Sequence, residues 1–182
     1  MYVSTKGVVS TRAPKAADEE IELEIVDFAG QLEYFVMHAL ILSGAHAIYL
    51  FVAKLLSQQH VDSRHTRIMQ QLHFWVGFLR TLLPRNVSVP AAIALTHADR
   101  LSPEELKQVD CKQIISQLQQ AQHDPFTFES CRTLNYDNGD NPSSSPDVIS
   151  LRREVMEIAK SYSSRHWIPQ SYRDAQVALQ QQ

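Results

Sequence analysis

The chain of 182 residues is poor in glycine and cysteine and has no long uninterrupted apolar run. Its two cysteines are too few for a disulfide framework, so we expect a reducing compartment and a cytoplasmic location. The longest apolar stretch, from Phe35 to Leu56, is interrupted by polar and basic residues, which argues against a membrane span. No basic segment followed by an apolar run opens the sequence, so no signal peptide is predicted.

Positive charge is also scarce. The formal net charge is −3, whereas a nucleic-acid partner usually requires a basic face. The length favours one domain, and the hydrophobic fraction of 44% is enough for a substantial core. The composition therefore predicts a single globular domain that binds no nucleic acid.

The apolar pattern alternates between short strands and longer helices. Strands are predicted at 3–11, 21–26, 47–52, 89–95 and 126–134. Helices are predicted at 32–42, from Asp62 or Ser63 to Pro84, from Ser102 through Leu118, and at 147–162. Such alternation predicts an α/β fold of three layers, with a mostly parallel sheet flanked by helices. Ligands of such sheets bind at the carboxyl ends of the strands.

Two short motifs follow predicted strands. The first is Asp27-Phe28-Ala29-Gly30-Gln31, in which the carboxylate can hold Mg²⁺ through water and the glycine lets its backbone N–H approach a phosphate. A strand-to-helix turn explains the same residues equally well. The second motif is Thr96-His97-Ala98-Asp99. Its carboxylate can accept two hydrogen bonds from guanine, although a helix-capping aspartate is the simpler reading of that residue alone.

Taken together, the two motifs resemble the DxxGQ and [NT]KxD motifs of the Ras-like GTPases. The Ser-Thr-x-Gly sequence at 4–7 and the Thr-His-x-Asp form of the second motif are similar to the Roc domain of Roco proteins. The segment from His166 to Tyr172 resembles the junction into a COR domain. The resemblance therefore implies a Roc domain at 1–164, and a linker with the start of a COR domain at 165–182.

The resemblance also implies roles for individual residues. Thr5 and Asp27 would bind Mg²⁺, Gly30 the γ-phosphate, and Gln31 the attacking water. The guanine base would contact Thr96, His97 and Asp99. His97 stands where most relatives have lysine, so the usual packing of an aliphatic stem along the base is lost. A further base-contacting loop is matched to Ser130 and Cys131, although a plain strand end explains these two residues as well.

The phosphate-binding loop of the family is missing. No G-x-x-x-x-G-K-[ST] motif occurs in the sequence, and no glycine precedes lysine. We therefore expect GTP or GDP with Mg²⁺ to bind, and GTP to be hydrolysed, only when that segment is supplied. The family's first strand would also be absent, which suggests a fragment of a larger Roco protein. The strand ending at Asp27 and the strand at 47–52 would then pair directly or leave a gap of about 10 Å.

Two functions remain open. The first is a GTPase switch domain that works with the COR domain and other domains of a parent protein. The alternative is a pseudo-GTPase that acts as an interaction or dimerisation module. Its docking face would include Trp75, Phe78 and Leu79, unless these residues simply cover the sheet. The resemblance implies a homodimer. A metal enzyme is a distant third possibility, because the eight histidines form no close ligand pair.

Overall fold

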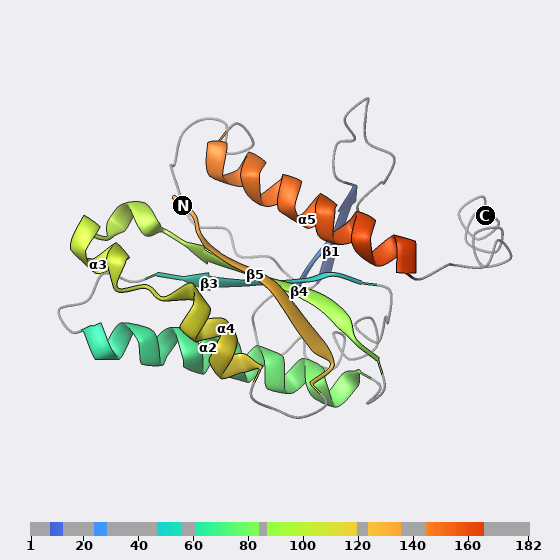
Figure 1. Cartoon of the computed structure of the whole chain (residues 1–182), viewed down its shortest axis with the longest axis horizontal. Coiled ribbons are helices and arrows are strands. Elements are labelled where there is room, and N and C mark those ends of the chain that lie inside the picture. The colour runs from blue at the N-terminus through green and yellow to red at the C-terminus, as the bar shows by residue number, and fades with distance from the viewer. Residues whose placement is uncertain are drawn as a thin grey trace, which may run out of the picture.

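The computed structural model describes residues 8–12, 24–28, 47–55, 61–83, 87–119, 124–135 and 145–165. These residues form two separate sheets (Figure 1). In the smaller sheet, β1 (Val8–Arg12) pairs antiparallel with β2 (Glu24–Phe28). The larger sheet contains three parallel strands in the order β3-β4-β5: β3 (Tyr49–Lys54), β4 (Val89–Thr96) and β5 (Phe126–Thr133).

Helices lie on both faces of the larger sheet (Figure 1). α2 (Val61–Leu82) and α4 (Cys111–Leu118) lie on one face, and α5 (Pro146–Arg165) lies on the other. The short α3 (Pro103–Lys107) precedes α4. The predicted α/β class and the parallel sheet are therefore confirmed for this part of the chain. In the part of the chain that the structure describes, no helix combines the length and the apolarity that crossing a bilayer requires.

β4 is the central strand, and every residue from Val89 to Leu95 is buried. Its near-continuous apolar sequence is typical of a parallel strand that is covered on both faces. β3 instead alternates: Tyr49 and Phe51 are buried, whereas Leu50 and Val52 are 42% and 62% exposed. The helical layer opposite α2 therefore covers β4 and leaves apolar side chains of β3 open to solvent.

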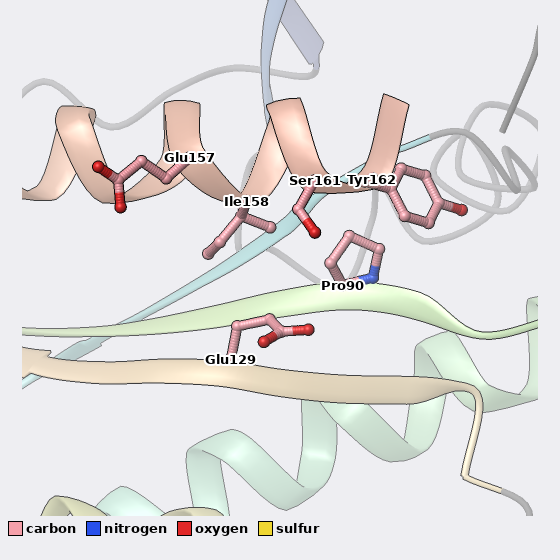
Figure 2. Close-up of a pocket in the computed structure, with 6 residues that line it drawn as sticks. All are labelled: Pro90, Glu129, Glu157, Ile158, Ser161 and Tyr162. Atoms are coloured by element: carbon pink, nitrogen blue, oxygen red, sulfur yellow. The ribbon is translucent and has the colours of Figure 1, made fainter. Parts of the chain in front are cut away.

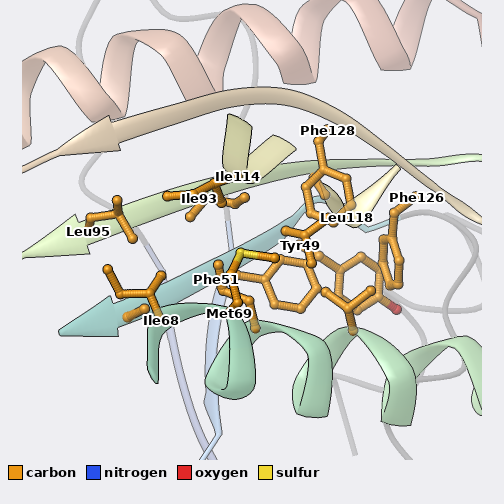
Figure 3. Packing of buried hydrophobic residues seen from close by; sticks show 14 of the residues in the cluster. Tyr49, Phe51, Ile68, Met69, Ile93, Leu95, Ile114, Leu118, Phe126 and Phe128 are labelled. Carbon is orange, nitrogen blue, oxygen red and sulfur yellow. The ribbon is translucent and has the colours of Figure 1, made fainter. Parts of the chain in front are cut away.

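The core lies between this sheet and α2 (Figure 3). The rings of Phe51 and Phe126 meet edge-on, with centroids 5.5 Å apart, and Tyr49 meets Phe126 in the same way at 5.3 Å. This edge-to-face geometry is the favoured one for aromatic pairs. α2 contributes Ile68, Met69, Leu72, Val76 and Leu79 at helical spacing.

A bulge in β5 changes which side chains face each layer. Ala91 of β4 pairs with Phe128, but Ala92 pairs with Ser130, so Glu129 is the extra residue. After the bulge, Cys131 packs against the core. Arg132 points to the other layer, where its Nη1 donates a hydrogen bond to Ser150 Oγ of α5 at 2.7 Å.

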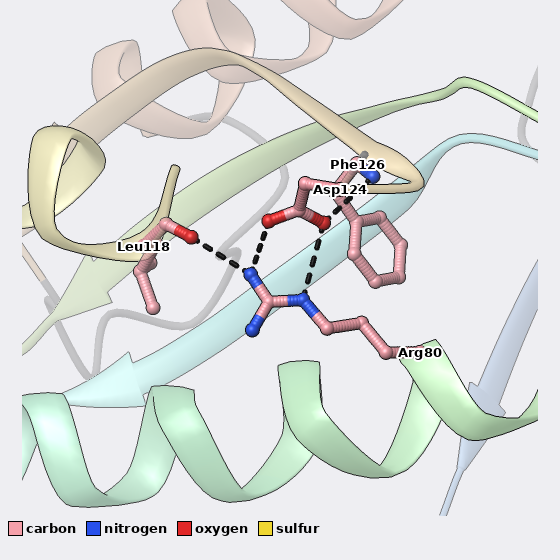
Figure 4. Close-up of polar contacts among 4 residues, drawn as sticks. All are labelled: Arg80, Leu118, Asp124 and Phe126. Carbon is pink, nitrogen blue, oxygen red and sulfur yellow. Dashed lines mark hydrogen bonds and ion pairs between the residues drawn. The ribbon is translucent and has the colours of Figure 1, made fainter. Parts of the chain in front are cut away.

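An arginine joins three elements on the α2 side (Figure 4). Arg80 donates from Nε to Asp124 Oδ1 at 3.1 Å and from Nη2 to the Leu118 carbonyl at 2.8 Å, and Nη2 also pairs with Asp124 Oδ2. Asp124 Oδ1 accepts a further bond from Phe126 N–H at 3.0 Å. The pair therefore links the last turn of α2 to the end of α4 and the start of β5.

Three predicted boundaries are wrong. Asp27 was expected at the tip of its strand, but it lies inside β2, opposite Val9. α2 begins at Val61, so Asp62 and Ser63 lie within it. The single helix from Ser102 is two helices. Ser102 forms the predicted capping box with Glu105, but Asp110 then caps a new helix by accepting from Lys112 N–H and Gln113 N–H.

Other expectations can be placed as well. The described parts of the strands predicted at 3–11 and 21–26 are indeed strands, β1 and β2. No strand pairing joins the two sheets in the described ranges, so β2 does not pair directly with β3. The predicted helix at 32–42 lies outside the described residues.

Candidate functional site

The chain turns sharply at the carboxyl end of β4. His97 follows the strand with φ 66° and ψ 35°, in the left-handed region, and a 3-10 helix, η2 (Ala98–Arg100), comes next. Non-glycine residues rarely adopt this conformation, although histidine is among the more tolerant. The turn carries the chain off the strand direction and places Asp99 at the exposed edge of the sheet.

A buried alanine fixes this turn. Ala98 is 4% exposed, and its N–H donates to the Leu134 carbonyl at 3.0 Å. Leu134 N–H donates in turn to the Leu95 carbonyl at 2.7 Å. The turn after β4 is therefore bonded through its backbone to the end of β5, and Asp99 projects from a fixed position.

Thr96 and His97 are within hydrogen-bonding distance of each other, and Thr96 also contacts β3. Thr96 Oγ1 donates to the Ala53 carbonyl of β3 at 3.4 Å, and it lies 3.0 Å from His97 Nδ1. These two contacts link His97 to the end of β3 through the Thr96 hydroxyl. Burial, together with the positive charges of Lys54 and Arg100, lowers the pKa of His97, and Asp99 opposes them. We therefore expect a neutral imidazole at neutral pH.

The sheet edge carries charges of both signs. Lys54 ends β3 and Arg100 ends η2; both are exposed, as is Asp99, and the charges of all three act on His97. An aspartate can accept two parallel hydrogen bonds, while the two cations favour an anionic ligand. The arrangement suits a ligand with a planar donor pair and negative charge elsewhere.

A residue not singled out from the sequence lies at the same edge. Asn135 follows β5, and its N–H donates to Asp147 Oδ2 in the first turn of α5 at 2.8 Å. Lys54 was also missed. The rule that ligands gather where parallel strands end already applied to Asn135, which directly follows the predicted strand 126–134, and it would have found Lys54 if the third strand had been extended beyond residue 52.

Ser130 and Cys131 lie elsewhere. They pair with Ala92 and Ile93 in the middle of β4, so the structure does not bring them to the edge that carries Asp99. Ser130 is 8% exposed, and its hydroxyl has no hydrogen-bond partner within the described ranges. This location matches the plain-strand alternative better than a base-contacting loop.

Of the residues expected to bind phosphate and metal, Asp27 alone lies within the described ranges. Asp27 is exposed on β2, in the sheet that no strand pairing connects to β4. Thr5, Gly30 and Gln31 lie outside the described residues. Within the residues that the structure places, no group of three histidine, cysteine or acidic side chains could hold a metal ion. Among the predicted site residues that lie in the described ranges, Thr96, His97 and Asp99 are the ones brought together.

A cavity of about 230 Å³ lies at the opposite end of β4 (Figure 2). It is bounded by β4, β5 and α5, and it is lined by Pro90, Glu129, Glu157, Ile158, Ser161 and Tyr162. Burial raises the pKa of Tyr162. Since Pro90 is the second residue of β4 and Asp99 follows its last, this cavity is separate from the motif residues.

The chain matches no protein-family model and no curated protein. Function therefore has to be inferred from the chemistry of the residues at the carboxyl edge.

Proposed function

We propose that this chain is the base-recognising part of a guanine-nucleotide-binding switch domain of the Roc type, in which Asp99 selects guanine. The observation that supports this most directly is the position of Asp99. It follows the central parallel strand, next to the buried Ala98, with its carboxylate at the exposed sheet edge. Parallel α/β sheets bind their ligands at this edge.

The proposed contacts follow from the chemistry of the base. Guanine presents an N1–H and an exocyclic amine on one side, and an aspartate can accept both hydrogen bonds. Adenine lacks that donor pair and would leave the carboxylate without a partner, which is costly in a binding site. The neutral imidazole of His97 offers a flat face to the base where relatives use a lysine stem.

The phosphate end needs groups that the sequence does not contain. Guanine nucleotides are held mainly through a glycine-rich loop and its lysine, which neutralise the phosphates, and Mg²⁺ supplies further positive charge. In the proposed domain, Thr5 and Asp27 would hold Mg²⁺, Gly30 would contact the γ-phosphate and Gln31 would orient water. We propose no hydrolytic step for the chain without that loop.

The test is a titration with fluorescent GDP and ATP. It uses this chain and the same chain preceded by a strand, a glycine-rich phosphate loop and a helix. We expect the extended chain to bind, with GDP but not ATP as a competitor. Equal competition by ATP would remove the role given to Asp99.

Substitution of Asp99 sharpens this test. Asp99→Asn exchanges an acceptor for a donor, so affinity for GDP should fall by at least tenfold while xanthosine diphosphate, which carries a carbonyl in place of the amine, should bind better. Glu104→Gln, on the exposed first turn of α3, is the matched control and should change neither affinity. Unchanged base preference in the Asp99 variant would contradict the proposal.

The interaction-module alternative is favoured by exposed apolar side chains. Val52 is 62% exposed, and Phe74 of α2 is 48% exposed with its ring 5.5 Å from that of Trp75. The face expected from the sequence is only partly at the surface, because Leu79 is buried and Trp75 and Phe78 pack against the core. Failure of the extended chain to bind any nucleotide would favour this alternative.

A further inference from the structure

The cavity between β4, β5 and α5 carries charge of one sign. Its volume is about 230 Å³, and both charged residues of its lining are acidic, Glu129 of β5 and Glu157 of α5 (Figure 2). No ion pair among the described residues includes either carboxylate. Arg153 and Lys160 neighbour Glu157 at helical spacing on α5, but neither lines the cavity. The lining therefore favours a cation.

The bulge in β5 turns Glu129 toward this cavity. Phe128 and Cys131 both pack against the core on the α2 side, so the two residues between them, Glu129 and Ser130, face the α5 side. A regular strand alternates its faces, and only the extra residue of the bulge allows two successive side chains on one face. Figure 2 shows Glu129 pointing from β5 toward α5. Bulges commonly re-aim a side chain beside a functional site.

Ser130 adds a buried polar group to the same layer. It is 8% exposed, and its hydroxyl makes no hydrogen bond within the described ranges. Buried hydroxyls of folded proteins are nearly always satisfied by protein, water or ligand atoms. The layer between β5 and α5 therefore contains, next to Glu129, a polar atom that a bound molecule can satisfy.

The rest of the lining selects the kind of cation. Pro90, Ile158 and the ring of Tyr162 form an apolar wall, and Ser161 adds a hydroxyl. A primary ammonium has three N–H donors for carboxylate and hydroxyl oxygens, and its alkyl chain can pack against the apolar wall. A metal ion is served less well, because no three histidine, cysteine or acidic side chains come together in the described part of the chain. The volume lies below that of pockets for drug-sized molecules, so the ligand is small.

We propose that this cavity binds a short alkylammonium ion, whose charge pairs with Glu129 and Glu157 while its chain lies along Pro90 and Ile158. The two carboxylates come from different elements, so the bound cation links β5 to α5. The site is independent of the proposed base contact, because Pro90 and Asp99 lie at opposite ends of β4. A free amine and the side chain of a lysine offer the same chemistry, and the test separates the two.

The test is a titration of the ¹⁵N-labelled full chain with n-butylamine at neutral pH, followed by NMR. We expect saturable shifts of the amide signals of Glu129, Glu157 and Ser161. Because both carboxylates are exposed, the dissociation constant should be on the order of 1–10 mM. The neutral n-butanol should give no saturable shift. N-acetyl-lysine methylamide is the second arm: binding tighter than that of butylamine assigns the ammonium to a peptide lysine, and weaker binding assigns it to a free amine.

Matched variants complete the design. Glu129→Gln and Glu157→Gln keep the size of the side chain and remove its charge, so each should weaken butylamine binding at least threefold. Both positions are exposed, so the variants should fold. Glu104→Gln removes one charge from the exposed first turn of α3 and should leave binding unchanged. Equal shifts with butanol, butylamine shifts that do not saturate, or unchanged binding in both cavity variants would overturn the proposal.

Discussion

The two sheets of this chain differ in how much of their apolar surface is covered. In the three-stranded sheet, all of β4 from Val89 to Leu95 is buried between helical layers. In the two-stranded sheet, Ile25 and Val26 of β2 are 55% and 37% exposed. An isolated pair of strands is marginally stable at best, whereas a sheet packed against helices is stable on its own.

The residues proposed for the base and for Mg²⁺ lie on different sheets. Asp99, which we assign to the base, lies on the packed sheet and is fixed by backbone bonds to β5. Asp27, which the family resemblance assigns to Mg²⁺, lies on the thinly packed pair. The residue proposed for the base therefore lies on the sheet that packs into the hydrophobic core, and the residue proposed for Mg²⁺ lies on the two-stranded sheet, exposed to solvent.

The largest expected loss of unfolding free energy comes from a cavity in the three-stranded sheet. Ile93 is fully buried in β4, so Ile93→Ala removes buried methyl groups and leaves a cavity that costs about 3–4 kcal/mol of unfolding free energy. Ile25→Ala is the matched change on β2, and we expect less than about 1 kcal/mol there because the side chain is half exposed. Urea denaturation measures both. Equal losses at the two positions would contradict the contrast between the sheets.

A smaller effect compares two ion pairs within the packed region. The Asp124 side chain is only 7% exposed and satisfies both Arg80 and Phe126 N–H, so Asp124→Ala should cost about 2–3 kcal/mol. The pair of Arg132 with Glu154 is more open, with side-chain exposures of 42% and 24%. Glu154→Ala should cost less than about 1 kcal/mol.

Thermal and urea unfolding of both variants check this ranking. Asp124→Asn serves as a control, because it keeps an acceptor for Phe126 N–H but loses the charge, and its cost should fall between those of the two alanine variants. A cost for Glu154→Ala equal to that for Asp124→Ala would show that the α5 side is anchored as firmly as the α2 side.

The sequence located secondary-structure elements well where burial or capping imposes a local residue pattern. The β4 run and the capping box at Ser102 were located closely, because apolar continuity and capping are local signals. Asp110 was missed as a cap because the apolar stripe continues across it. The Glu129 bulge was missed as well, and with it the mid-strand location of Ser130, because register depends on the partner strand.

The candidate site was predictable in part for the same reason. The motif from Thr96 to Asp99 could be placed because it directly follows a buried run, and the end of such a run marks a sheet edge. The left-handed backbone of His97 could not, since nothing in Thr-His-Ala-Asp requires a positive φ. The hydrogen bonds from Ala98 and Leu134 that hold this turn come from elements far apart in the sequence.

The smallest expected effect tests that turn. A β-branched residue in the left-handed region is strained, so His97→Val should cost about 1–2 kcal/mol of unfolding free energy. His97→Asn also removes the imidazole, yet asparagine tolerates this backbone and should cost less than about 1 kcal/mol. Both variants lose the imidazole and its hydrogen bond to Thr96. The difference between their unfolding free energies therefore reports the strain of the left-handed backbone alone. His73→Val, at an exposed position of α2, gives the cost of the same exchange in an ordinary helix, about 0.5 kcal/mol or less. Equal unfolding free energies for the valine and asparagine variants in urea denaturation would contradict this. The left-handed backbone of His97 would then not be what fixes the position of Asp99 on the three-stranded sheet.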